Sequence, residues 1–190
     1  MAVTMKAIIV SGMPAVGKTT VSRIVAKTLD LPIVGGGDVL KEMAVEEGYS
    51  PGGDDWWDTG DGMRFLKERK RSPDFDREVD NRLKQKAKAG DVVITSYPLP
   101  WLTDHGLKVW LSGSVLSRAR RMSKRDGISV AKCRNVLSIR DVENYKLYKK
   151  IYGIEFGKDL GCFDLVVDTE TIPESRVAEV ILRYVKNRRG

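Results

Sequence analysis

The sequence predicts an α/β protein in which helices cover both faces of a parallel sheet. Short apolar, largely β-branched segments alternate with helix-like segments along the chain, and a glycine-rich loop joins the first of each. The apolar segments do not alternate with polar residues, which is typical of strands buried on both faces. We therefore expect a five-stranded parallel sheet between two helical layers, a three-layer αβα sandwich.

Five strands are expected, at residues 6–11, 32–35, 92–96, 107–111 and 165–168. Helices are expected at residues 18–29, 39–47, 74–89, 116–125, 130–152 and 173–186. Residues 49–61, rich in glycine and aspartate around Trp56 and Trp57, are expected to form a loop or a broken helix. A length of 190 residues suits a single domain, 1–190, with insertions after the second and the fourth strand.

Composition favours a cytoplasmic protein, and we expect a monomer. The apolar fraction of 42% is ordinary, and no apolar run has the length of a membrane-spanning helix or a signal peptide. Cys133 and Cys162 lack metal-binding spacing and are interpreted as free thiols. The net charge of +7 fits a nucleic-acid surface or a site for several phosphates. Without a nucleic-acid-binding motif, phosphate handling is favoured, with no membrane partner.

The most informative motif is GMPAVGKT at residues 12–19, which has the spacing of a phosphate-binding loop between a strand and a helix. A chance strand–turn–helix connection is disfavoured because the full spacing stands in the required context. Lys18 is expected to reach the terminal phosphates of a nucleoside triphosphate, and the Thr19 hydroxyl to ligate Mg²⁺. ATP and Mg²⁺ are the expected cofactors, and the residues expected to cradle the triphosphate are Gly12, Met13, Pro14, Ala15, Val16, Gly17, Lys18, Thr19 and Thr20.

Further segments resemble nucleoside monophosphate kinases, and archaeal-type cytidylate kinases in particular. The residues that carry this resemblance are 36–41 (GGDVLK), 76–80 (DREVD), 91–94 (DVVI), 108–111 (KVWL), 118–121 (RARR), 140–141 (RD), 151–154 (IYGI) and 164–169 (DLVVDT). The resemblance covers nearly the whole chain outside residues 47–72. It implies a P-loop kinase fold, an acceptor-binding insertion at about 38–90 and a lid at about 126–148. It also implies transfer of the ATP γ-phosphoryl group to CMP or dCMP, giving ADP and CDP or dCDP.

The resemblance assigns catalytic roles on the donor side. Arg121 and Arg125, four residues apart on one helix face, would stack on adenine and contact the triphosphate, although they also fit a solvated basic face. Arg140 would stabilise the migrating phosphoryl group, or else pair with Glu143 three residues away. Thr169, at the end of the last strand, would line the adenine pocket.

On the acceptor side, the resemblance assigns substrate binding to Asp38, Lys41 and Arg77. Lys41 stands where the family pattern has an arginine, so it would lack bidentate recognition of the acceptor phosphate. Arg77 could instead pair with Asp80 or with neighbouring carboxylates.

Four further positions depart from the family pattern. Thr95 and Tyr97 stand where an acidic residue and an arginine are expected, Asn144 where an acidic residue is expected, and Leu147 where an arginine is expected. These departures keep two alternatives open. One is another small-molecule kinase, for a different nucleotide, dephospho-coenzyme A, gluconate or a shikimate-like acceptor, which the arginines Arg64, Arg69 and Arg71 could serve. The other is a catalytically weak ATP-binding protein that regulates a partner.

Overall fold

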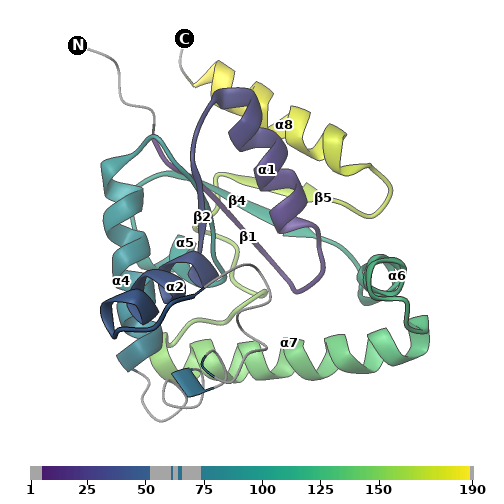
Figure 1. Ribbon diagram of the computed structural model, residues 1–190. Coiled ribbons are helices and arrows are strands. Elements are labelled where there is room, and N and C mark those ends of the chain that lie inside the picture. Colours follow the sequence, from purple (N-terminus) through teal and green to yellow (C-terminus); the bar gives the residue numbers. More distant parts are fainter. Residues whose placement is uncertain (1–5, 52–60, 62–63, 66–73, 189–190) are drawn as a thin grey trace.

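The computed structural model describes residues 6–51, 61, 64–65 and 74–188, and these form a five-stranded, all-parallel sheet flanked by helices (Figure 1). The predicted class and the five parallel strands are confirmed. The strand order is β2-β3-β1-β4-β5. The strands are β1 (Ile8–Gly12), β2 (Ile33–Gly35), β3 (Val93–Thr95), β4 (Leu107–Ser112) and β5 (Leu165–Asp168).

Each helix expected from the sequence is present, with ends that differ by at most a few residues. The helices in the described part of the chain are α1 (Lys18–Leu29), α2 (Gly36–Glu46), α4 (Asp74–Ala89), α5 (Leu99–Leu102), α6 (Val115–Asp126), α7 (Val130–Tyr152) and α8 (Glu174–Asn187). Helix α2 begins earlier than expected because the Asp38 carboxylate accepts a hydrogen bond of 2.7 Å from the Gly35 N–H and caps the glycine-rich first turn. The four-residue α5 was not predicted.

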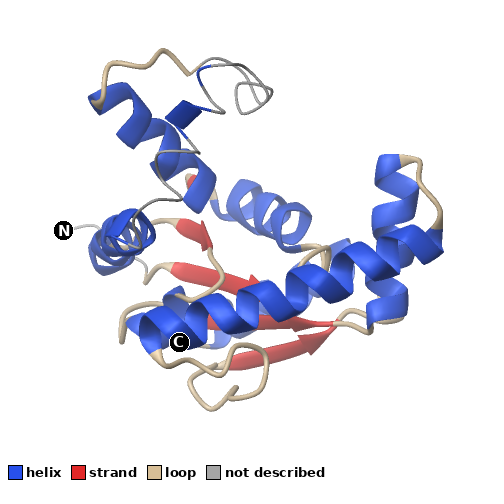
Figure 2. Ribbon diagram, turned by 90° about the horizontal axis from the view of Figure 1, so that it is seen from below, coloured by secondary structure: helices blue, strands red, loops and turns tan. Residues whose placement is uncertain are grey.

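Alternate residues of the central strand face two different helical layers. Ile8 and Val10 belong to the core under α1 and α8, whereas Ile9 belongs to the core under α2 and α4. All three side chains are buried, with at most 1% of their surface exposed. Figures 1 and 2 show α1 and α8 on one side of the sheet and α2, α4 and α5 on the other. The period-2 pattern of a strand thus explains the three layers.

An aromatic cluster extends the layer of α2, α4 and α5 towards α7. Trp110 on β4 packs with Tyr148 of α7 and with Phe156, and Tyr97 and Trp101 pack against this group. These contacts attach the C-terminal part of α7 to the sheet, while its N-terminal part projects with α6 as a helical hairpin (Figure 2).

The α6–α7 hairpin has a small core of its own. Ala119, Met122, Cys133 and Leu137 are buried between the two helices, and Ala15 of the glycine-rich loop packs against them. The predicted lid, 126–148, therefore corresponds to the turn after α6 and most of α7. Trp56, Trp57, Arg69 and Arg71 lie outside the described residues. None of the described helices combines the length and the apolar character needed to cross a bilayer.

Candidate active site

The loop between β1 and α1 lies at the carboxyl edge of the sheet. Strands β1 and β4 are neighbours there, but the chain continues from β1 towards β2 at one end of the sheet and from β4 towards β5 at the other. Gly12 has a φ of 149°, and a Cβ there would lie 2.4 Å from the Leu111 carbonyl oxygen. Gly17 (φ 104°) adopts positive φ as well, as does Ala15 (φ 60°). This backbone aims the unpaired N–H groups at the start of α1 into one concave loop, which suits an anion.

Lys18 is folded back onto this loop. Its Nζ donates hydrogen bonds to the carbonyl oxygens of Gly12 (2.8 Å) and Met13 (2.9 Å), and lies 4.4 Å from the ring centroid of Tyr97. Burial, and then the charges of Arg140 and Arg118, lower the pKa of the ammonium to about 7. A cation held in this way gains electrostatic stabilisation when an anionic phosphate reaches it.

Two pockets open on either side of Lys18. The first, of about 390 Å³, is lined by Ala15, Val16, Gly17, Lys18, Thr19, Thr20, Tyr97, Arg121, Met122, Arg125, Arg140 and Glu174. The second, of about 440 Å³, is lined by Lys18, Thr19, Gly36, Gly37, Leu40, Asp76, Val79, Asp80, Leu83, Thr95, Ser96, Tyr97, Pro98, Asn144, Leu147 and Tyr148. Lys18, Thr19 and Tyr97 line both. Two ligands seated in these pockets would meet at Lys18.

The first pocket gathers cations from three elements: Lys18 from α1, Arg121 and Arg125 from α6, and Arg140 from α7. The guanidinium of Arg121 donates to Thr169 Oγ1 (2.9 Å) and to the Thr169 carbonyl oxygen. The structure therefore brings together the donor-side residues that the sequence singled out. Arg125 also pairs with Asp126, at 2.5 Å.

Comparison with known proteins identifies the family of the chain. The family model of the cytidylate kinase-like family matches residues 7–171. A cytidylate kinase of Pyrobaculum aerophilum is 35% identical over 182 residues, which are 95% of this chain and 92% of the relative. One of Pyrococcus horikoshii is 36% identical over 163 residues, 85% of this chain and 79% of the relative. The chain belongs to the cytidylate kinase-like family.

The fold of this family member is shared more widely. A shikimate kinase of Acinetobacter baumannii, solved in complex with shikimate, superposes with a TM-score of 0.57. Its sequence is 18% identical, and the match covers 97% of this chain and 95% of that one. At this identity the likeness shows the P-loop kinase fold alone.

Four of the departures from the family pattern, Thr95, Tyr97, Asn144 and Leu147, meet in the second pocket, whereas Lys41 does not line it. Thr95 and Tyr97 reach it from the end of β3, and Asn144 and Leu147 from one face of α7. The expected acceptor residues lie close by rather than in its lining. Asp38 caps α2, while the neighbours of Lys41 and Arg77, namely Leu40 and Asp76, line the pocket. The roles of Asp38, Lys41 and Arg77 remain predictions.

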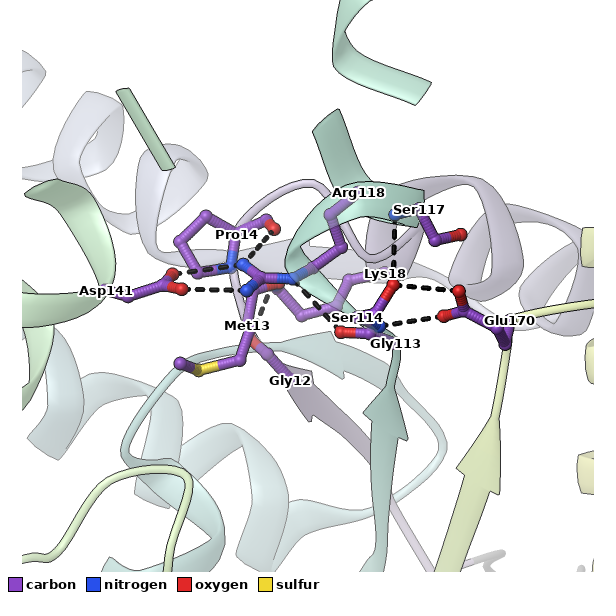
Figure 3. A network of polar contacts seen from close by, with 10 residues as sticks. All are labelled: Gly12, Met13, Pro14, Lys18, Gly113, Ser114, Ser117, Arg118, Asp141 and Glu170. Carbon is purple, nitrogen blue, oxygen red and sulfur yellow. Dashed lines mark hydrogen bonds and ion pairs between the residues drawn. The ribbon is translucent and has the colours of Figure 1, made fainter. Parts of the chain in front are cut away.

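Sequence reasoning gave no role to Arg118, yet this buried residue connects three parts of the family member's site (Figure 3). Its guanidinium donates to both carboxylate oxygens of Asp141 on α7, at 3.0 and 2.7 Å. It also donates to the carbonyl oxygens of Pro14 (3.1 Å) in the loop and Gly113 (3.2 Å) after β4. Arg118 and Asp141 both lie in segments that carry the resemblance, but their pairing across 23 residues has no local sequence signal.

Proposed function

We propose that the protein transfers the γ-phosphoryl group of ATP to CMP or dCMP, giving ADP and CDP or dCDP. The observation that carries this proposal is the pair of pockets that share Lys18, Thr19 and Tyr97. In the reaction, an oxygen of the acceptor phosphate forms a bond to the γ-phosphorus while the bond to the β–γ bridging oxygen breaks. Both reactants must meet at one point, and the shared lining provides it.

The glycine-rich loop fits the triphosphate of ATP. A Cβ at Gly12 would collide with the Leu111 carbonyl oxygen, so glycine lets the loop turn closely beside β4, and α1 adds the partial positive charge of its N-terminus. Residues 12–20 would hold the triphosphate, and the exposed Thr19, which faces both pockets, would offer its hydroxyl to Mg²⁺. Mg²⁺ prefers oxygen ligands and would neutralise charge on the phosphates.

We call the first pocket, which is lined by the glycine-rich loop, the donor pocket. Its cations fit the charge of the transferred group. Lys18, Arg121, Arg125 and Arg140 would converge on the triphosphate and the migrating phosphoryl group. Catalysis of phosphoryl transfer consists mainly of positioning and charge stabilisation, so such a cluster supplies its central requirement. Because Arg140 comes from α7, this helix would contribute directly to the reacting centre.

The second pocket, which we call the acceptor pocket, contains groups suited to cytosine. Asp76 and Asp80, one turn apart on α4, both line it, and Tyr152 donates a hydrogen bond of 2.6 Å to Asp80 Oδ2. A carboxylate accepts hydrogen bonds from an exocyclic amino group such as that of cytosine, and it repels the carbonyl oxygen that uracil carries at that position. These carboxylates support CMP or dCMP over UMP.

The altered lining supports a second candidate. Thr95, Tyr97, Asn144 and Leu147 replace charged groups around the acceptor, which favours a changed acceptor specificity. Another small-molecule acceptor, or ATP binding with weak catalysis that regulates a partner, are therefore the competing functions.

We further propose a cytoplasmic monomer that acts on small nucleotides. Cys133 is buried and Cys162 half-buried, and both are free thiols, which suits a reducing compartment. Burial also raises the pKa of the Cys162 thiol, so little of it is in the reactive thiolate form.

The test is ADP release from ATP–Mg²⁺ with CMP, dCMP, UMP, AMP, GMP, shikimate, gluconate and dephospho-coenzyme A as acceptors. We expect turnover with CMP or dCMP, lost in Lys18→Ala and kept in Lys27→Ala, a matched lysine in the last turn of α1. Turnover confined to another acceptor would replace the substrate while keeping the fold. ATP binding with no acceptor phosphorylated would contradict the kinase function and favour the regulatory one.

A further inference from the structure

Tyr97 occupies the point where the donor and acceptor pockets meet, directly beyond the end of β3. Its backbone is fixed, because the hydroxyl of the fully buried Ser11 donates a hydrogen bond of 2.8 Å to its carbonyl oxygen. Its ring packs 5.7 Å from that of Phe156 and 6.2 Å from that of Tyr148, centroid to centroid. The side chain is therefore held from both its backbone and its aromatic neighbours.

One cation of the loop contacts this side chain. The Lys18 ammonium lies over the ring, 4.4 Å from its centroid, where the negative face of an aromatic ring attracts a cation. Arg140 of α7 lines the same pocket as Lys18 and Tyr97. Burial raises the pKa of the Tyr97 phenol, and the charge of Arg140 opposes that rise. The ring of Tyr97 is thus the neighbour that holds the loop lysine at the junction.

The contact with the ring opposes a repulsion inside the site. Lys18 and Arg140 carry like charges, and the charge of Arg140 is one cause of the lowered pKa of Lys18. The negative face of the Tyr97 ring offers the ammonium a favourable contact that helps to keep it at the junction.

An ordinary packing role would be the simplest alternative, because Tyr97 belongs to a large aromatic cluster. Trp101 provides the comparison within that cluster. It packs on Trp110 and Phe156 and donates its indole N–H to the Asp159 carbonyl oxygen at 2.9 Å, but it lines neither pocket. Packing alone does not require a ring placed against the loop lysine.

We propose that Tyr97 is a positioning residue for phosphoryl transfer, whose ring holds Lys18 at the junction of the two pockets. The inference rests on the proposed kinase function and names the residue that organises its reacting centre. Removing the positioning should lower kcat more than it changes the KM for ATP, because the cations would still bind phosphates but less often in the productive arrangement.

The experiment compares Tyr97→Phe, Tyr97→Leu and Trp101→Leu with the wild-type protein, at a temperature where thermal melts show all four to be folded. Tyr97→Phe keeps the ring under Lys18, so kcat should stay within about 3-fold of wild type. Tyr97→Leu should lower kcat about 100-fold, with the KM for ATP changed less than about 3-fold. Trp101→Leu should lower the melting temperature and leave kcat within about 2-fold of wild type.

Three results would overturn the inference. They are an unchanged kcat in Tyr97→Leu, an equal loss of kcat in Trp101→Leu, and a loss of ATP affinity by calorimetry as large as the loss of kcat. A parallel assay follows phosphate release from MgATP without acceptor, where water takes the phosphoryl group. If the wild-type protein phosphorylates no acceptor, the proposed function fails, and the hydrolysis rates decide the role of Tyr97. Hydrolysis that is reduced in Tyr97→Leu and retained in Tyr97→Phe would support it, and equal rates in both variants and the wild type would refute it.

Discussion

Arg118→Met should be among the most destabilising single substitutions near the site. The Arg118 side chain is 3% exposed and its Asp141 partner 16% exposed, so removal of the guanidinium leaves a carboxylate largely shielded from water without its cation. Breaking such a buried pair costs about 3–5 kcal/mol. The carbonyl oxygens of Pro14 and Gly113 would also lose their donor. For a domain of this size the cost corresponds to a fall in melting temperature of about 6–20 °C.

Urea denaturation of the nucleotide-free protein measures this cost, and a double-mutant cycle isolates the pair. Arg118→Met combined with Asp141→Leu should be less destabilising than the sum of the two single changes. In the double variant both charges of the pair are removed together, so no buried charge is left without a partner. The matched control is Arg176→Met, which removes an exposed pair with Glu179 (side chains 65% and 48% exposed) and should cost less than about 1 kcal/mol. Additive single changes, or a cost of Arg118→Met no larger than that of the control, would refute the reasoning.

Two further predictions concern the glycine-rich loop. Gly12→Ala should abolish binding of ATP and lower the urea midpoint, since its Cβ would lie 2.4 Å from the Leu111 carbonyl oxygen at a φ of 149°; calorimetric binding equal to wild type would contradict this. Because the pKa of Lys18 is lowered to about 7 in the folded, nucleotide-free protein, the unfolded state binds more protons above pH 7. The free energy of unfolding should therefore rise more steeply with pH between about 7 and 10 in the wild type than in Lys18→Met, by at most about 1.4 kcal/mol per pH unit. Equal slopes in urea melts at pH 7.5 and 9.5 would argue against a lowered pKa.

The features predicted correctly from sequence are those that local physics determines. Continuous apolar segments such as residues 7–10 (AIIV) are favoured as doubly buried parallel strands whatever they pack against. The phosphate-binding loop combines glycine positions, a lysine and a helix start within eight residues, so its conformation follows from its own sequence. The start of α2 was placed too late because Gly36 and Gly37 have low helix propensity, whereas the Asp38 carboxylate compensates by capping them.

The features that sequence reasoning missed depend on packing between distant segments. Arg118 contacts Pro14 across 104 residues, and its neutralisation by Asp141 requires the α6–α7 hairpin to close beside the loop. Tyr97 was interpreted as a missing arginine, a loss of charge at the site. Its contact with Lys18 depends on β3 lying next to β1, and no local pattern contains that information. Tyr97 was visible as a departure from the family pattern and Arg118 as part of the resemblance, but only the fold identifies their partners.

The distribution of the departures separates the two halves of the site. The donor pocket is lined by residues 15–20 of the loop and by Arg121, Arg125 and Arg140, the arginines to which the resemblance assigns donor-side roles. Thr95, Asn144 and Leu147 line the acceptor pocket alone, and Tyr97 lines both pockets. Since the pockets share Lys18, a change confined to the acceptor wall can alter which molecule receives the phosphoryl group without altering how that group is delivered. Tyr97 belongs to the changed lining of the acceptor pocket and also contacts Lys18 through its ring. We therefore expect this residue to combine a changed acceptor pocket with an unchanged delivery of the phosphoryl group.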